Sequence, residues 1–121
     1  NACNYSFIGS RNFILPKKSN NKIYIKMDNS QISSNFRLIL SKNLYLGKKV
    51  ILGGMNTKII DDIDDAYKST IFLKNIFVGS NAIIKNGVRI NKNIVIGANT
   101  LIENHLLSSG KYFSKKINIF N

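Results

Sequence analysis

The stretch IFVGSNAIIKNGVRINKNIVIGANTLIENHLL, residues 76–107, repeats an apolar position every six residues. Counting from Phe72, the first position of each six-residue unit, or hexad, is occupied by Phe72, Val78, Ile84, Ile90, Ile96 and Ile102. The fifth position is occupied by Ile76, Ala82, Val88, Ile94, Thr100 and Leu106. Side chains repeat every 3.6 residues in an α-helix and every two in a strand, so neither element alone sets this period. A fixed period over several units indicates a repeat architecture.

The same template fits a second run of sequence upstream. Residues 28–57 place Leu40, Leu46 and Leu52 at the first position and Ile32, Leu38, Leu44 and Val50 at the fifth. Five hexads start at residues 28–52 and six start at residues 72–102. Eleven units in two runs form a much more specific signal than any single hexad.

Turn-forming residues recur at fixed places in these hexads. The fourth position is Asn or Gly in six of the eleven, namely Asn43, Asn75, Asn81, Gly87, Asn93 and Asn99. Asn and Gly adopt positive φ at low cost, as a repeating tight turn requires. Each unit is therefore predicted to be a short strand followed by a turn, and stacked units are predicted to form an all-β fold with parallel strands.

The pattern resembles the hexapeptide-repeat acyltransferase family, whose motif is an aliphatic residue, Gly, two variable residues and a small or aliphatic residue. The segments VGSNAI, IGANTL and LGKKVI match this motif. The resemblance covers roughly residues 28–107 and implies a left-handed parallel β-helix with three hexads per coil, hence three to four coils. We expect coils at residues 28–57 and 72–107, a projecting loop at 58–71 and a tail at 108–121. The alternative is a β-sandwich with fortuitous spacing.

The interruption between the two runs carries the candidate catalytic residues. In sugar O-acetyltransferases of this family, a loop at this place bears a His that acts as the general base. Here Asp62 and Asp64 lie at or near the matching positions, so the resemblance suggests them as substitute bases. A carboxylate is a weaker base than imidazole. One alternative is an exposed acidic loop without a catalytic role. Another is a cation site at the four Asp residues, but no ligand spacing supports it, so we predict no metal.

The only histidine of the chain, His105, lies at a turn in the last hexad. A surface turn residue is a simpler interpretation than a catalytic base, because the family's base lies elsewhere. The zinc-dependent carbonic anhydrase branch of the family needs several His ligands, so one His excludes that branch.

The resemblance also implies a place for acetyl-CoA. In family members, the pantetheine arm lies along the helix in a groove between neighbouring subunits, where small residues let it approach. Candidate contacts are Gly79 and Ser80, with Gly97 and Ala98 one coil later. Lys115 and Lys116 lie near the place of a family Lys that meets the cofactor phosphates, although the family's Asn-Pro turn is missing. The alternative is that solenoid turns simply prefer small residues.

Composition sets further bounds. The 121 residues suffice for one domain, which we expect to span residues 3–121, and 44% of them are hydrophobic. No apolar run approaches the roughly 20 residues of a membrane span, and no signal-peptide pattern is present. The single Cys fits a reducing compartment, so we expect a cytoplasmic protein. Asn1 and Ala2 resemble the end of a Ser-Asn-Ala expression tag, so we expect the native sequence to begin at Cys3.

Charge is unevenly distributed. The formal net charge is +12, and four of the six acidic residues are Asp61, Asp62, Asp64 and Asp65. A basic surface attracts polyanions such as nucleic acid, anionic lipid, a phosphorylated cofactor or an acidic glycan, although it can also serve solubility alone. Nucleic acid is not expected, because the chain has neither an aromatic stacking motif nor an Arg-rich helix.

Two functional hypotheses follow from these patterns. The first is an acetyl-CoA-dependent O-acetyltransferase that acts on a sugar or surface polysaccharide as a homotrimer, by direct attack of an acceptor hydroxyl on the thioester. The second is a catalytically degenerate β-helix that serves as an oligomerisation or glycan-binding module. The missing His and the missing tail motif favour the second hypothesis.

Overall fold

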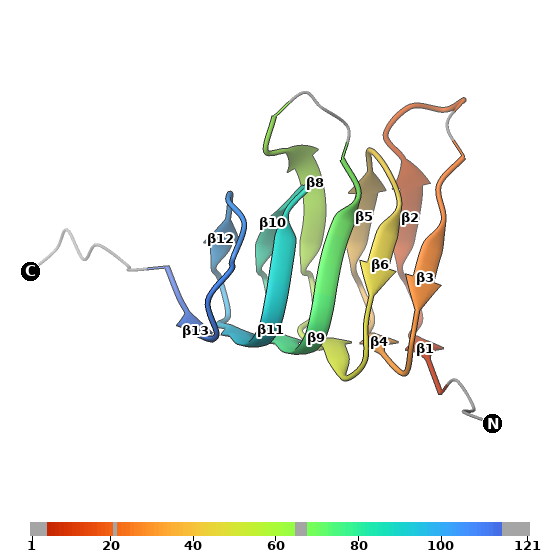
Figure 1. The fold of residues 1–121 in the computed structure, drawn as a ribbon. Coiled ribbons are helices and arrows are strands. Elements are labelled where there is room, and N and C mark those ends of the chain that lie inside the picture. Colours follow the sequence, from red (N-terminus) through yellow and green to blue (C-terminus); the bar gives the residue numbers. More distant parts are fainter. Residues whose placement is uncertain (1–4, 21, 65–67, 115–121) are drawn as a thin grey trace, which may run out of the picture.

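The computed structural model describes residues 5–20, 22–64 and 68–114 and forms a parallel β-solenoid of about four turns (Figure 1). The described residues are all-β and contain no helix, and hence none long and apolar enough to cross a membrane. The strands are β1 (Phe7–Ile8), β2 (Phe13–Pro16), β3 (Ile25–Met27), β4 (Gln31–Ile32), β5 (Arg37–Leu40), β6 (Leu44–Leu46), β7 (Val50–Leu52), β8 (Lys58–Asp62), β9 (Thr70–Val78), β10 (Ile83–Asn86), β11 (Arg89–Ile96), β12 (Leu101–Ile102) and β13 (Gly110–Tyr112).

The strands lie on three faces, and neighbouring strands pair in parallel. Face A consists of β1, β4, β7, residues 76–78 of β9, residues 94–96 of β11, and β13. Face B consists of β2, β5, β8, β10 and β12. Face C consists of β3, β6, residues 70–74 of β9 and residues 89–92 of β11. Ile76 pairs with Ile94 and Ile84 with Ile102, each eighteen residues on, which confirms three hexads per coil in this part of the chain.

The two apolar columns point inward and form the core, as the period predicts. All first-position residues from Phe72 to Ile102 are buried, as are the fifth-position residues from Ile76 to Thr100, while Leu106 is partly buried. Ile32 and Leu38 are also buried, but they pair with Leu52 and Ile59, so they align with the first column of later coils instead of the fifth. Burial of these columns supplies the main driving force for folding.

Turns between the faces use the residues that the repeat predicts. Asn75, Asn81, Asn93 and Asn99 have positive φ, as does Gly87; Lys49, at a fourth position that holds neither Asn nor Gly, has positive φ as well. Asn43, predicted with the other asparagines, is not among the positive-φ residues. At the turn before face A, the coils approach each other so closely that a Cβ on Gly47 would clash with the carbonyl oxygen of Leu73. Gly is therefore required there by stacking of the chain on itself.

Three predicted boundaries are wrong. Residues 58–62 belong to a strand of face B, with Ile59 fully buried, and β9 starts at Thr70, so the connection between strands is shorter than the predicted loop 58–71. Strands β1 to β3 add a coil before residue 28, and β13 pairs with β11 within the predicted tail. The six-residue period failed at these places because insertions at the turns displace it by a few residues.

Candidate functional site

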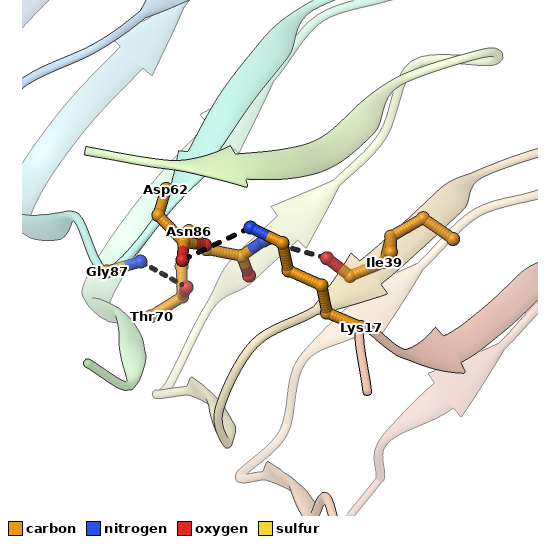
Figure 2. Close-up of polar contacts among 6 residues, drawn as sticks. All are labelled: Lys17, Ile39, Asp62, Thr70, Asn86 and Gly87. Carbon is orange, nitrogen blue, oxygen red and sulfur yellow. Dashed lines mark hydrogen bonds and ion pairs between the residues drawn. The ribbon is translucent and has the colours of Figure 1, made fainter. Parts of the chain in front are cut away.

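The carboxyl ends of the face B strands bring polar residues together along one edge of the solenoid, the upper edge in Figure 1. Lys17 follows β2, Ser41 follows β5, Asp62 ends β8 and Asn86 ends β10. Because the strands are parallel and in register, their ends meet at the same corner in successive coils. We call the side chains of Lys17, Asp62, Thr70 and Asn86 the polar corner (Figure 2).

A β-bulge decides which aspartate faces inward at this corner. Ile60 pairs with Lys85, but the next pair is Asp62 with Asn86, so Asp61 is an extra residue in β8. Asp61 has φ of 50° and is exposed. The extra residue places Asp62 beside Asn86 on the inward side, and the Asp62 side chain is only 7% exposed. Bulges commonly re-aim side chains next to functional sites.

Hydrogen bonds and an ion pair hold the polar corner. Lys17 Nζ lies 3.3 Å from Asp62 Oδ2, so the ammonium neutralises the buried carboxylate. Asn86 Nδ2 donates to the carbonyl oxygen of Ile39 at 2.7 Å, and the backbone N–H of Gly87 donates to Thr70 Oγ1 at 2.9 Å (Figure 2). The first of these bonds fixes the amide of Asn86 against a strand two coils earlier, and the second holds the turn after β10.

Three buried side-chain oxygens in this region have no hydrogen-bond partner among the described residues: Asp62 Oδ1, Asn86 Oδ1 and Ser41 Oγ. Buried polar atoms are almost always paired, because leaving one unpaired costs about 1–3 kcal/mol. Two of the three are acceptors only, so they can be satisfied by a hydroxyl, an amine or a cation. The polar corner thus has acceptor capacity that the described residues do not fill.

Asp64, the second predicted base, lies in a different environment. Its side chain is 51% exposed and forms an ion pair with Lys68 at 3.6 Å. An exposed carboxylate paired within its own segment is typical of a solvated turn. Of the two predicted catalytic aspartates, only Asp62 therefore lies in a structured polar site.

His105 is exposed at a turn, as predicted. Its Nδ1 accepts a hydrogen bond from the backbone N–H of Arg89 at 2.8 Å. This bond joins the last coil to the preceding one, beside the pair of Ile90 and Leu106. Nδ1 therefore already accepts a backbone hydrogen bond, which disfavours its use as a base toward a substrate.

The predicted cofactor residues stack one coil apart, but the chain itself fills part of the space beside them. A Cβ on Gly79 would lie 2.8 Å from the backbone nitrogen of Ala98, so this Gly permits coil stacking. A Cβ on Gly97 would lie 2.8 Å from the Phe113 ring, which covers that position. Ser80 is partly exposed and Ala98 is exposed. A pantetheine chain passing over Gly97 would need Phe113 to move.

The two groups of predicted site residues do not lie together within one chain. Gly79 and Gly97 precede β10 and β12, whereas Asp62 and Asn86 end β8 and β10. Face B separates the two edges by a strand of four to five residues, on the order of 15 Å. A shared site would have to form between subunits.

Lys115 and Lys116 lie outside the described residues, as do Asn1 and Ala2. Among the residues described, no group of three or more His, Cys, Asp or Glu side chains could hold a metal ion.

Sequence reasoning missed Lys17 and Asn86. Lys17 lies 45 residues from Asp62 in a stretch without a hexad pattern, so no local signal connects the two. Asn86 lies in a regular hexad, but its neighbour across the sheet depends on the bulge at Asp61.

Comparison of the chain with protein-family models, curated proteins and solved structures finds no significant match.

Proposed function

We propose that this protein is an O-acyltransferase that takes an acetyl group from acetyl-CoA and transfers it to a hydroxyl of a sugar or surface polysaccharide, in the cytoplasm. The observation that carries the proposal is Asp62, a carboxylate 7% exposed, with one oxygen paired to Lys17 and the other unpaired beside an unpaired amide oxygen. Such a group is suited to accept a proton from a hydroxyl.

In the proposed reaction, the acceptor hydroxyl donates a hydrogen bond to Asp62 Oδ1. Lys17 pairs with Oδ2 at 3.3 Å, and this attraction offsets part of the cost of burying the carboxylate. The hydroxyl oxygen forms a bond to the thioester carbonyl carbon as the carbon–sulfur bond breaks, and its proton passes to Asp62. The sulfur leaves as a thiolate, which takes up a proton from solvent or from Asp62. The acyl donor supplies the activated carbonyl, and no covalent bond to the protein forms.

The active unit is proposed to be a homotrimer. The polar corner lies at one end of the face B strands, and Gly79, beside the proposed acetyl-CoA groove, lies at the other. Packing of face B against a neighbouring subunit would bring the polar corner of one subunit near the acetyl-CoA groove of the other. The outward side chains of face B are rich in apolar residues, namely Phe13, Leu15, Ile39, Ile60, Ile83 and Leu101. Rotational closure would bury such a face.

The proposal is tested by thiol release from acetyl-CoA in the presence of a panel of neutral and acidic mono- and oligosaccharides. Acceptor-dependent release that is lost in Asp62→Asn supports it. Release equal in wild type and Asp62→Asn assigns the chemistry elsewhere and contradicts it.

The second candidate is a β-solenoid without catalysis that serves as an oligomerisation or glycan-binding module. The covering of Gly97 by Phe113 favours this candidate, because it closes the predicted donor groove. A folded protein that releases no thiol with any acceptor, yet remains oligomeric or binds glycans, would support it.

A further inference from the structure

Lysines line the corner where face C turns into face A. Lys48, Lys74 and Lys92 occupy equivalent places in three successive coils, and Lys49 lies beside Lys48. Lys74 and Lys92 are direct register partners, while the carbonyl of Lys48 accepts the N–H of Asn75. We call these four residues the lysine ladder.

No described carboxylate forms an ion pair with the lysine ladder. All four side chains are exposed, and none forms a salt bridge with another described residue. Asp61, Asp62 and Asp64 lie at or just after the carboxyl end of β8, away from the ladder. Glu103 forms an ion pair with Lys85. Among the described acidic residues, Asp28 lies at this corner, directly after β3 and one coil before Lys48. Like charges on adjacent strands, roughly 4.8 Å apart, repel each other, and an anionic ligand would relieve that repulsion.

Beside the ladder is a shallow hollow of about 250 Å³. One side is polar and formed by Lys49, Asn75 and Asn93. The side-chain amides of the two asparagines are linked by a hydrogen bond that Asn75 Nδ2 donates to Asn93 Oδ1 at 2.8 Å. The other side is apolar and formed by Ile51, Phe77 and Val95, which are register partners on face A. Charge, amides and an exposed aromatic ring therefore lie side by side along the solenoid axis.

We propose that the lysine ladder and this hollow bind a linear acidic polysaccharide whose carboxylates follow the ladder. The charges form a line along one edge, which matches a chain polymer better than a planar membrane surface. Lysines contact single carboxylates as point charges, without the bidentate geometry that arginine offers to phosphate. The Asn amides match sugar hydroxyls, and Phe77 with its apolar neighbours matches the C–H face of a sugar ring. The proposed site is independent of acyl transfer and lies away from the polar corner.

The test is calorimetric titration of the full chain with short polygalacturonate oligomers at low and moderate salt. Binding that weakens with salt is expected, and Lys74→Gln/Lys92→Gln should weaken it roughly 10-fold or more. Lys22→Gln/Lys42→Gln is the matched control: it removes two exposed lysines that precede β3 and β6, at the opposite end of face C from the ladder. It should change affinity less than 3-fold, roughly the effect of reduced net charge alone.

Several results would overturn the proposal: absence of polygalacturonate binding, equal weakening by both double variants, or equal binding of neutral dextran. A single-stranded oligonucleotide of equal charge that binds more tightly than polygalacturonate would assign the ladder to nucleic acid instead. Circular dichroism of each variant verifies that the solenoid is folded, and Phe77→Ala, expected to weaken binding at unchanged net charge, provides a second test of the same site.

Discussion

Asp62 lies opposite Asn86 across the β8–β10 pair because one extra residue, Asp61, bulges from β8. The pairing places a carboxylate and an amide side by side on the inward side of the strand ends, each with one oxygen unpaired among the described residues. The nearby ammonium of Lys17 makes burial of the carboxylate tolerable. An arrangement of this kind, unsatisfied and held by a bulge, is more typical of a functional site than of a stabilising core.

Replacing Asp62 should abolish acyl transfer without unfolding the protein. We expect Asp62→Asn to lower the turnover of an accepted sugar by roughly 100-fold or more, since general-base catalysis contributes on that scale. Asp64→Asn is the matched control, because the Asp64 side chain is 51% exposed and forms an ion pair with Lys68 of its own segment, and the variant should retain activity. Equal losses in both variants would contradict the assignment of the base to Asp62.

The bulge at Asp61 should tolerate Gly or Asn but not a β-branched residue. With φ of 50°, Asp61→Ile would place a branched side chain in the left-handed region, at a cost of about 1–2 kcal/mol. Thermal unfolding should therefore show a lower midpoint for Asp61→Ile than for Asp61→Gly. Asp64→Ile, at a position without positive φ, serves as the control and should unfold near the wild-type temperature.

The proposed trimer should depend on face B and not on face A. Leu15→Glu introduces a charge among the outward apolar residues of face B, and burying it between subunits would cost several kcal/mol. Light scattering should then give the mass of a trimer for wild type and of a monomer for Leu15→Glu. Val95→Glu places the same charge on face A and should remain trimeric. A monomeric wild-type protein would refute the proposed assembly.

Removing Phe113 should tighten binding of acetyl-CoA. Its ring is 67% exposed but covers Gly97, so a donor that uses this groove must first displace it. Phe113→Ala removes that requirement, and we expect the dissociation constant to fall roughly 2- to 10-fold, because the open form would then predominate. Phe7→Ala, an exposed aromatic of the first coil, is the control. Weaker binding in Phe113→Ala would show that the ring contacts the donor instead of excluding it.

Much of the fold could be predicted from the sequence, because the inward columns of a solenoid are repeated in the chain itself. Val78, Ile84 and Ile96 are buried as the six-residue period requires. The predicted element boundaries are wrong where the period is broken. Ile59 belongs to the core, but the acidic residues after it made this strand resemble a loop. The polar corner could be predicted only in part, since Asp62 was named from a family resemblance while Lys17 and Asn86 approach it through the stacking of coils.

Calorimetric titration of the folded protein with acetyl-CoA tests the proposal that acetyl-CoA is the acyl donor. We expect saturable heat with one binding site per subunit, retained in Asp62→Asn because the proposed role of that carboxylate is toward the acceptor and not the donor. Absence of heat at millimolar acetyl-CoA, for a protein shown to be folded and trimeric, would contradict the proposal.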